Sequence, residues 1–190
     1  SIVMQAFHSL LNQEDQRIQE LQRALVQQHG FQPFHPADRA LVDQYSRECI
    51  FFDLSFTNFW TWDRVFHYRW RMLGDTLAVT YINLDQVPSA ILLPGPAQDL
   101  TAAAAGIWEL FGRAGYPAMF EYVPERWLPL YRSTGFALEI ATDRDWSDYV
   151  YDVADFTNLV GGENRSKRRG LKLAAAQGAE FRPLERGNLD

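Results

Sequence analysis

The chain has 190 residues, of which 47% are apolar and 14% aromatic, so a disordered chain is excluded and one domain, or one domain and the start of another, is expected. Its formal net charge is −6, but residues 1–160 hold 11 basic and 20 acidic side chains, whereas residues 161–190 hold 7 and 4. The acidic body disfavours a protein that coats nucleic acid, because such a protein needs a broad basic face.

The sequence predicts helices first and strands later. Ile18, Leu21 and Leu25 follow the i, i+3, i+7 spacing of an amphipathic helix, which we predict over residues 9–28. Helices are also predicted over residues 37–49 and 56–62, and a β-hairpin around Gly74-Asp75. The remaining predicted elements are the strands Ala90–Leu93, Ala118–Val123, Phe136–Thr142 and one beginning at Glu180–Pro183, and the helices Ala97–Ala114, Glu125–Ser133 and Asn164–Gln177.

This order predicts an α/β (α+β) protein with a central mixed β-sheet and helices on both faces. Two helices, three antiparallel strands and then alternating helices and strands resemble the order of the GNAT-type acyltransferase fold. Such enzymes hold the cofactor pyrophosphate on backbone N–H groups between a strand and the next helix. Here the corresponding loop would present Gly95, Ala97 and Gln98, although Pro94 and Pro96 supply no N–H. The alternative is a rigid turn into a structural helix.

Several kinds of site have no pattern in the sequence. The single cysteine excludes an internal disulfide, and the four histidines show no metal-ligand spacing, so we expect no metal. No apolar run approaches the roughly 20 residues of a membrane span. We therefore expect a protein of the reducing cytoplasm without a transmembrane segment. No activated nucleophile stands out, so any catalysis would rely on positioning and backbone polarisation.

Three stretches carry a family pattern. Residues 145–169 read DWSDYVYDVADFTNLVGGENRSKRR, residues 53–62 read DLSFTNFWTW, and residues 93–95 read LPG. In this order they resemble the bacterial DUF2156 family, which is related to the C-terminal region of phosphatidylglycerol lysyltransferases. The resemblance implies two GNAT-like domains in tandem. Residues 1–160 would be the first domain, residues 161–178 a basic connecting helix, and residues 179–190 the first strand of a truncated second domain.

The resemblance implies an acyl- or aminoacyl-transferase that uses an acyl-CoA or aminoacyl-tRNA donor. The second GNAT-like domain of the same chain, tRNA and a phospholipid headgroup would be its partners. We expect the full-length protein to be the enzyme and this fragment alone to be inactive. The family's asparagine after its basic run is replaced here by Gly170. The alternative from another class is a non-catalytic half that only packs on its partner domain.

The basic run supplies the candidate anion site. At about 100° per residue, four of its cations share one face of a helix and repel each other, which a bound anion would offset. The predicted anion-binding residues are Arg165, Lys167, Arg168, Arg169 and Lys172. The acidic body of the protein itself is the alternative partner for these side chains.

A second candidate site is an aromatic pocket. Tyr149 and Tyr151 share one face if extended, and they would line this pocket with Trp62 and Trp60. Ser55 and Asn58 could hydrogen-bond a substrate there. The alternatives are a core position for the aromatic residues and capping of the local helix by Ser55 or Asn58.

Overall fold

The computed structural model describes residues 2–47, 49, 51–142, 144, 147, 150–183, 185 and 187, with side chains from residue 15 onward. The chain forms two compact units, residues 1–142 and 143–190. The predicted α/β class is confirmed, because the first unit combines helices with one antiparallel sheet.

The sheet has three strands in the order β1–β2–β3, namely Arg69–Leu73, Thr76–Ile82 and Pro88–Leu93. The predicted hairpin is confirmed: Leu73 pairs with Thr76 across the turn, where Gly74 has a φ of 62°. That left-handed conformation costs glycine little. All residues of β2 and β3 are buried, which explains why these strands are apolar rather than alternating.

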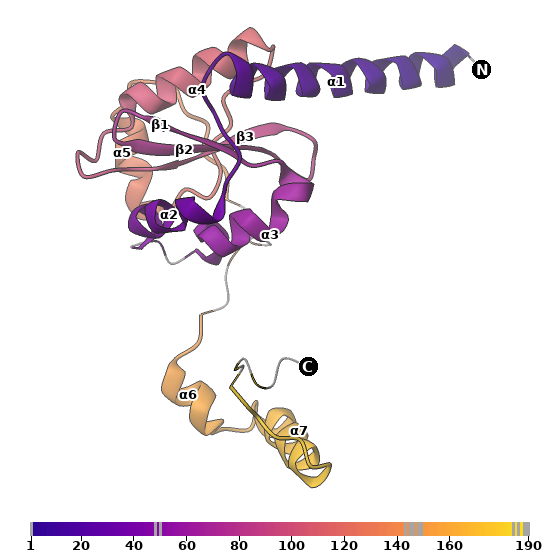
Figure 1. Ribbon diagram of the computed structural model, residues 1–190, viewed down its shortest axis with the longest axis vertical. Coiled ribbons are helices and arrows are strands. Elements are labelled where there is room, and N and C mark those ends of the chain that lie inside the picture. Colours follow the sequence, from indigo (N-terminus) through magenta and orange to yellow (C-terminus); the bar gives the residue numbers. More distant parts are fainter. Residues whose placement is uncertain are drawn as a thin grey trace. The chain divides into compact units, whose positions relative to one another are not determined.

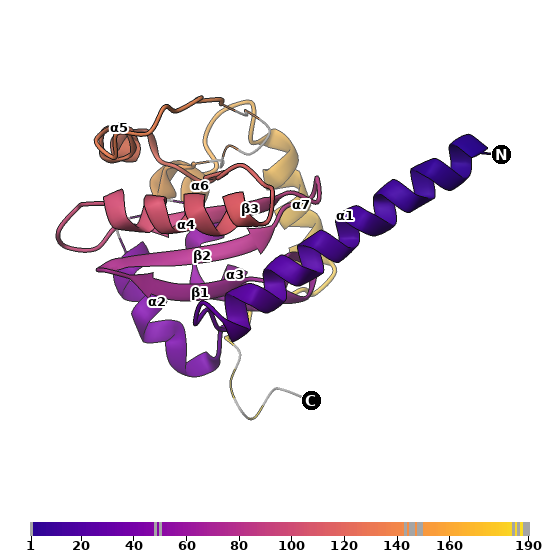
Figure 2. The same cartoon turned by 90° about the horizontal axis from the view of Figure 1, so that it is seen from above.

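Helices cover both faces of the sheet (Figure 1), as predicted. α1 (Ile2–Gln27) and α4 (Thr101–Arg113) lie on one face, and Figure 2 shows both in front of the strands. α2 (Arg39–Ser46) and α3 (Phe56–Phe66) lie on the other face. The shorter elements are three 3-10 turns and a short helix: Pro36–Asp38, Phe52–Leu54, Glu125–Trp127 and α5 (Leu128–Arg132).

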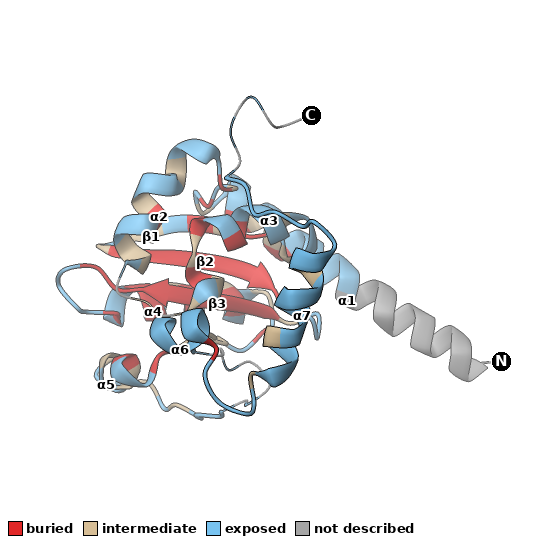
Figure 3. Cartoon of the chain, turned by 90° about the horizontal axis from the view of Figure 1, so that it is seen from below, coloured by how far each residue is buried: buried red, intermediate tan, exposed pale blue. Residues whose placement is uncertain are grey.

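Aromatic side chains fill the layer between the sheet and α3. The ring of Phe34 stacks on Phe59 at 5.1 Å and on Trp70 at 6.0 Å between centroids. Trp70 pairs with Val79, and Val79 with Ile91, so these three residues face the same layer. The buried residues concentrate on the sheet and on the inner sides of these helices (Figure 3).

On the face of the sheet covered by α1 and α4, two arginines donate hydrogen bonds to carbonyl oxygens at the ends of helices. Arg17 of α1 donates to the carbonyl oxygens of Ala114 and Gly115, just after α4, at 3.2 and 3.1 Å. Arg71 of β1 donates to the carbonyl of His29, just after α1, at 2.5 Å. Cations suit these positions because the last carbonyls of a helix lack intrahelical donors and carry partial negative charge.

The prediction of a mixed sheet needs correction. Instead of the predicted strand Ala118–Val123, the chain makes one isolated parallel bridge between Ala90 and Phe120. Its hydrogen bonds run from Ala90 N–H to Met119 O at 2.9 Å and from Glu121 N–H to Ala90 O at 3.0 Å. The predicted strand Phe136–Thr142 forms no ladder within the described residues. Strand formation depends on an available edge, which propensity alone does not reveal.

The helix predicted over Ala97–Ala114 begins four residues later, at Thr101. The residues before it are fixed by the β1–β2 turn, because the Asp75 carboxylate accepts from the Ala97 N–H at 2.8 Å. Asp99, one residue before the N-cap Leu100, accepts from the Thr101 N–H at 2.8 Å at the start of the helix.

The second unit contains α6 (Val153–Asn158) and α7 (Arg165–Ala176). α7 confirms the predicted basic helix, whereas α6 lies within residues that the sequence groups with the first domain. Among the described residues of this unit, Leu159 is the one buried hydrophobic side chain. The strand predicted from Glu180 is absent from residues 180–183. Within the described part of the chain, no helix combines the length and the apolar character needed to cross a membrane.

Candidate functional site

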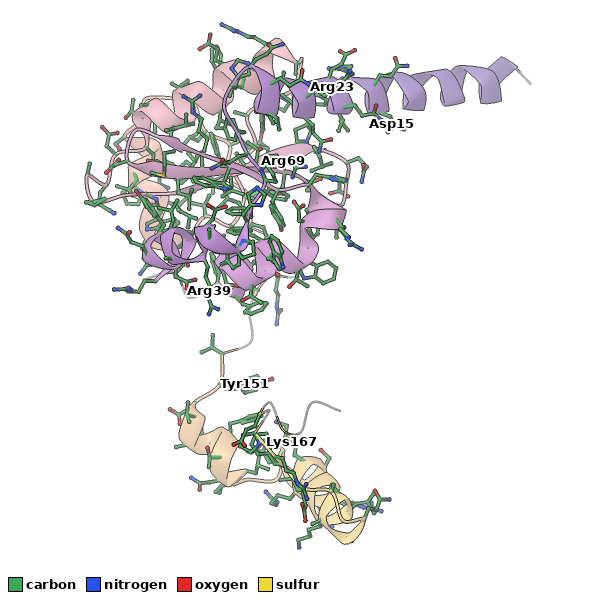
Figure 4. The ribbon with its side chains drawn as sticks, in the orientation of Figure 1. Asp15, Arg23, Arg39, Arg69, Tyr151 and Lys167 are labelled. Atoms are coloured by element: carbon green, nitrogen blue, oxygen red, sulfur yellow. The ribbon has the colours of Figure 1, made fainter. Side chains whose placement is uncertain are left out.

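The five cations of the predicted anion site, all in the second unit, form two sets: two have side-chain hydrogen bonds within the described residues of the unit and three do not. Lys167 belongs to the first set. Its ammonium lies 5.6 Å from the ring centre of Tyr151 and 5.8 Å from that of Phe156, and it donates to Asn164 Oδ1 at 3.1 Å. Figure 4 labels Tyr151 and Lys167. Both rings are more than half exposed, so these cation–π contacts lie at the protein surface.

Arg168 is the second cation with an internal role. One guanidinium nitrogen donates to the carbonyl oxygens of Leu159 and Gly161, the latter at 2.8 Å. Leu159 ends α6 in the left-handed conformation, with a φ of 50°. Arg168 therefore caps α6 and holds the turn that leads to α7.

The other three cations lie on one exposed stripe of α7. At about 100° per residue, Arg165, Arg169 and Lys172 fall within roughly 60° of arc and span about 10 Å along the axis. Within the described residues, none of these three side chains has a hydrogen bond or an ion pair. We call Arg165, Arg169 and Lys172 the basic stripe. Its positive charges repel one another.

Ser55 and Asn58, the proposed hydrogen-bonding residues of the aromatic pocket, are engaged locally. The Ser55 hydroxyl accepts from the Asn58 N–H at 3.2 Å and so caps α3. The Asn58 side chain is buried and donates to Asp53 O at 3.0 Å. These contacts agree with the capping alternative.

Within the first unit, the two tryptophans of the predicted pocket do not lie together. Trp60 stacks on Phe56 at 6.1 Å and Trp62 lies against Phe66 at 6.2 Å. At about 100° per residue they are roughly 160° apart around α3, so they occupy opposite flanks. Tyr151 belongs to the second unit, and Tyr149 lies outside the described residues.

The predicted cofactor loop is occupied by an internal carboxylate. Its Ala97 N–H donates to Asp75, and Gln98 donates from its backbone N–H and its side-chain amide to Gly95 O, both at 3.0 Å. A Cβ placed on Gly95 would lie 2.0 Å from Asp75 O. Gly95 thus permits close approach of the β1–β2 turn, and Asp75 accepts one N–H of the predicted cofactor loop.

Sequence reasoning missed Tyr131, which occupies the edge of β3. Ala90 directs its backbone groups to this edge, and Leu92, two residues later, faces the same way. The buried Tyr131 side chain lies there, close to the Leu92 backbone, where a neighbouring strand would pair. The Tyr131 ring also lies 5.4 Å from Phe120. This side chain therefore packs beside β3, next to the isolated bridge between Ala90 and Phe120. A lone tyrosine in a predicted helix gave no signal of this role.

A second polar contact connects the β2–β3 hairpin to Glu121, the residue after Phe120. Tyr81 donates its hydroxyl to one Glu121 oxygen, and Asn83 donates to the other at 3.3 Å. Burial raises the pKa of Tyr81, and the nearby Glu121 carboxylate raises it further. Burial also raises the pKa of Tyr68 and Tyr131.

These raised pKa values predict a loss of stability in alkali. The unfolded phenol ionises near its ordinary pKa of 10.0, whereas the folded phenol of Tyr81 stays neutral. Its contribution is complete below pH 10 and declines above it, by up to about 1.4 kcal/mol per pH unit. Tyr81→Phe should therefore reduce the loss between pH 10 and 11 by about 1 kcal/mol, measured by urea unfolding. An unchanged pH dependence would contradict the assignment.

Comparison with known proteins places the chain in a family. The family described as phosphatidylglycerol lysyltransferase, C-terminal, matches residues 51–189. No curated protein matches the sequence. A crystal structure of a conserved protein of unknown function from Bacteroides thetaiotaomicron VPI-5482 is similar in fold, with a TM-score of 0.63 and 20% identity. The similarity covers 78% of this chain and 50% of that one, so this chain spans about half of its length. The chain belongs to the family of the phosphatidylglycerol lysyltransferase C-terminal region.

Proposed function

We propose that this chain is part of an acyl- or aminoacyl-transferase with tandem GNAT-like domains, in which the basic stripe binds phosphate groups of the donor or acceptor. The observation that carries the proposal is the set of three cations on one exposed face of α7 with no described partner. Membership of a lysyltransferase family supports transferase chemistry. An aminoacyl-tRNA donor and a phospholipid headgroup acceptor both present such phosphates.

The spacing of the stripe favours a row of phosphates. Three cations along about 10 Å can each meet a different phosphate of an extended polyanion. Arginine suits this role because its planar fork donates two parallel hydrogen bonds to one phosphate. The proposal rests on three of the five predicted cations, because Lys167 and Arg168 already contact neutral groups of the second unit.

For the first unit we propose a scaffold role, which corresponds to the non-catalytic alternative. Asp75 at the Ala97 N–H and Tyr131 at the Leu92 backbone support this role, because both fill positions at which a donor cofactor would otherwise find N–H groups. Residues 161–178 would then connect this scaffold to a second domain that begins near residue 179. Heat of binding on titration of the chain with micromolar acetyl-CoA would contradict the scaffold role.

Neutralising the basic stripe tests the anion site. Arg165→Gln, Arg169→Gln and Lys172→Gln combined should weaken binding of a single-stranded RNA oligonucleotide at least tenfold at low salt. The wild-type logarithm of affinity should fall with the logarithm of salt with a slope of about −2, since three phosphates are neutralised. Fluorescence anisotropy across a salt series measures both quantities. Vesicles with and without anionic lipid provide the second arm and distinguish a headgroup from RNA.

The control removes the same charge elsewhere. Arg23, Arg39 and Arg113 are exposed arginines of α1, α2 and α4 in the first unit, and Figure 4 labels the first two. Replacing all three by Gln changes the net charge by the same amount and should leave binding near the wild-type value. Equal losses in both triple variants would mean that binding follows net charge alone, and the site would be rejected.

A further inference from the structure

The turn between α6 and α7 is held by side chains of α7 and of its N-cap residue, Asn164. The carbonyl oxygens of Leu159 and Gly161 accept from Arg168, and that of Val160 accepts from the Asn164 amide at 2.8 Å. All three consecutive carbonyls of the turn are thus bonded to the start of the basic helix. We call Asn164, Lys167 and Arg168 the latch.

We propose that Arg168 is a positioning residue, which fixes the rotation of α7 about its axis and so directs the basic stripe away from α6. The importance of this orientation for ligand binding rests on the proposed function. The orientation itself can be measured without any ligand.

The contacts of the latch act at two angles around α7. Relative to Arg165, Arg168 lies at roughly −60° and Lys167 at roughly 200°, while the stripe lies between about −20° and 40°. Arg168 is bonded to the turn, and Lys167 lies over the rings of Tyr151 and Phe156. Two attachments about 100° apart resist rotation of the helix, which a single attachment would allow.

Apolar packing cannot supply this restraint. Leu159 is the one buried hydrophobic residue among those described in this unit, and Leu171 and Leu173 of α7 remain about 60% exposed. Without a core between α6 and α7, directional contacts must define their angle. A charged donor that bonds two carbonyls is the strongest of those present.

Arg168 and Arg169 are neighbours with the same charge but different surroundings, so they form a matched pair. Arg168→Gln should remove the restraint and leave the three charges of the stripe in place. Arg169→Gln should remove one charge of the stripe and leave the restraint in place. Both variants change the net charge by the same amount.

The test is a distance distribution between spin labels, measured by electron–electron double resonance on the 190-residue chain. Val153→Cys and Leu173→Cys, in a Cys49→Ser background, place labels at exposed positions of α6 and α7. The distribution should be narrow in the parent and in Arg169→Gln, broad in Arg168→Gln, and intermediate in Arg168→Lys. A narrow distribution in Arg168→Gln would overturn the proposal. Loss of helical circular dichroism in that variant would also overturn it, because Arg168 would then fold α7 rather than orient it.

Binding of the RNA oligonucleotide supplies the second readout. Arg168→Gln should bind more weakly with an unchanged salt slope, because it contacts no phosphate. Arg169→Gln should reduce the magnitude of the slope by about 0.7. If the slope falls equally in both variants, Arg168 is a ligand contact and the proposal fails. If the parent binds neither RNA nor vesicles, the proposed function fails, while the distance result still decides the role of Arg168.

Discussion

Gly95→Ala is expected to lower the free energy of unfolding by about 3 kcal/mol. The new methyl group would lie 2.0 Å from the backbone oxygen of Asp75 and 2.8 Å from its carboxyl carbon. A backbone atom cannot turn aside as the end of a side chain can, so the Pro94–Gln98 loop or the β1–β2 turn must move. That movement would also break the bond from Ala97 N–H to Asp75. Urea unfolding followed by tryptophan fluorescence measures the change.

Gly112→Ala is the matched control, and we expect the opposite sign. Gly112 lies inside α4, and a Cβ there would meet no atom within 4 Å. Alanine should stabilise the helix by about 0.5 to 1 kcal/mol, because glycine loses more backbone entropy on folding. A similar effect of the two substitutions would contradict the close approach at Gly95.

The change in unfolding free energy of Gly95→Ala also tests the function of the Pro94–Gln98 loop. A glycine kept only to bring the backbone near a bound phosphate would tolerate alanine when no ligand is present. A large loss of stability in the ligand-free protein would instead mean that Gly95 serves contact between the loop and the β1–β2 turn. This outcome supports the scaffold role that we propose for the first unit.

The elements predicted correctly are those whose signals are local. Gly74-Asp75 between two β-branched and aromatic runs is sufficient for a hairpin, and the spacing of Ile18, Leu21 and Leu25 is sufficient for a helix. The Phe136–Thr142 run has equally good strand residues but forms no ladder in the described chain. A strand needs a partner edge, and nothing local reports whether one is available.

The basic helix shows the same limit for the site. Periodicity places Arg165, Arg168, Arg169 and Lys172 on one side of a helix, and the structure has that helix. Periodicity could not show that Arg168 has a different role from its neighbours. The carbonyls that accept from Arg168 lie in a turn, and the conformation of that turn depends on Leu159 adopting a positive φ. Leucine rarely adopts that conformation, so the sequence contains no sign of it.

Tyr131→Ala should lower the free energy of unfolding by about 4 kcal/mol, and Tyr131→Phe by about 1 to 2 kcal/mol. The alanine variant loses a buried ring that contacts Phe120 and leaves a cavity at the edge of β3. The phenylalanine variant keeps the ring and removes only the hydroxyl, which is buried close to the Leu92 backbone. Urea unfolding at pH 7 measures both values.

The difference in unfolding free energy between the two Tyr131 variants shows whether the ring or the hydroxyl covers the edge of β3. If Tyr131→Phe is as stable as the wild type, the hydroxyl does not substitute for a neighbouring strand, and that assignment is wrong. An exposed counterpart, Tyr151→Ala in the second unit, should leave unfolding of the first unit unchanged. If Tyr131→Ala gains measurable binding of acetyl-CoA that the wild type lacks, the tyrosine is what prevents a cofactor arm from lying along β3.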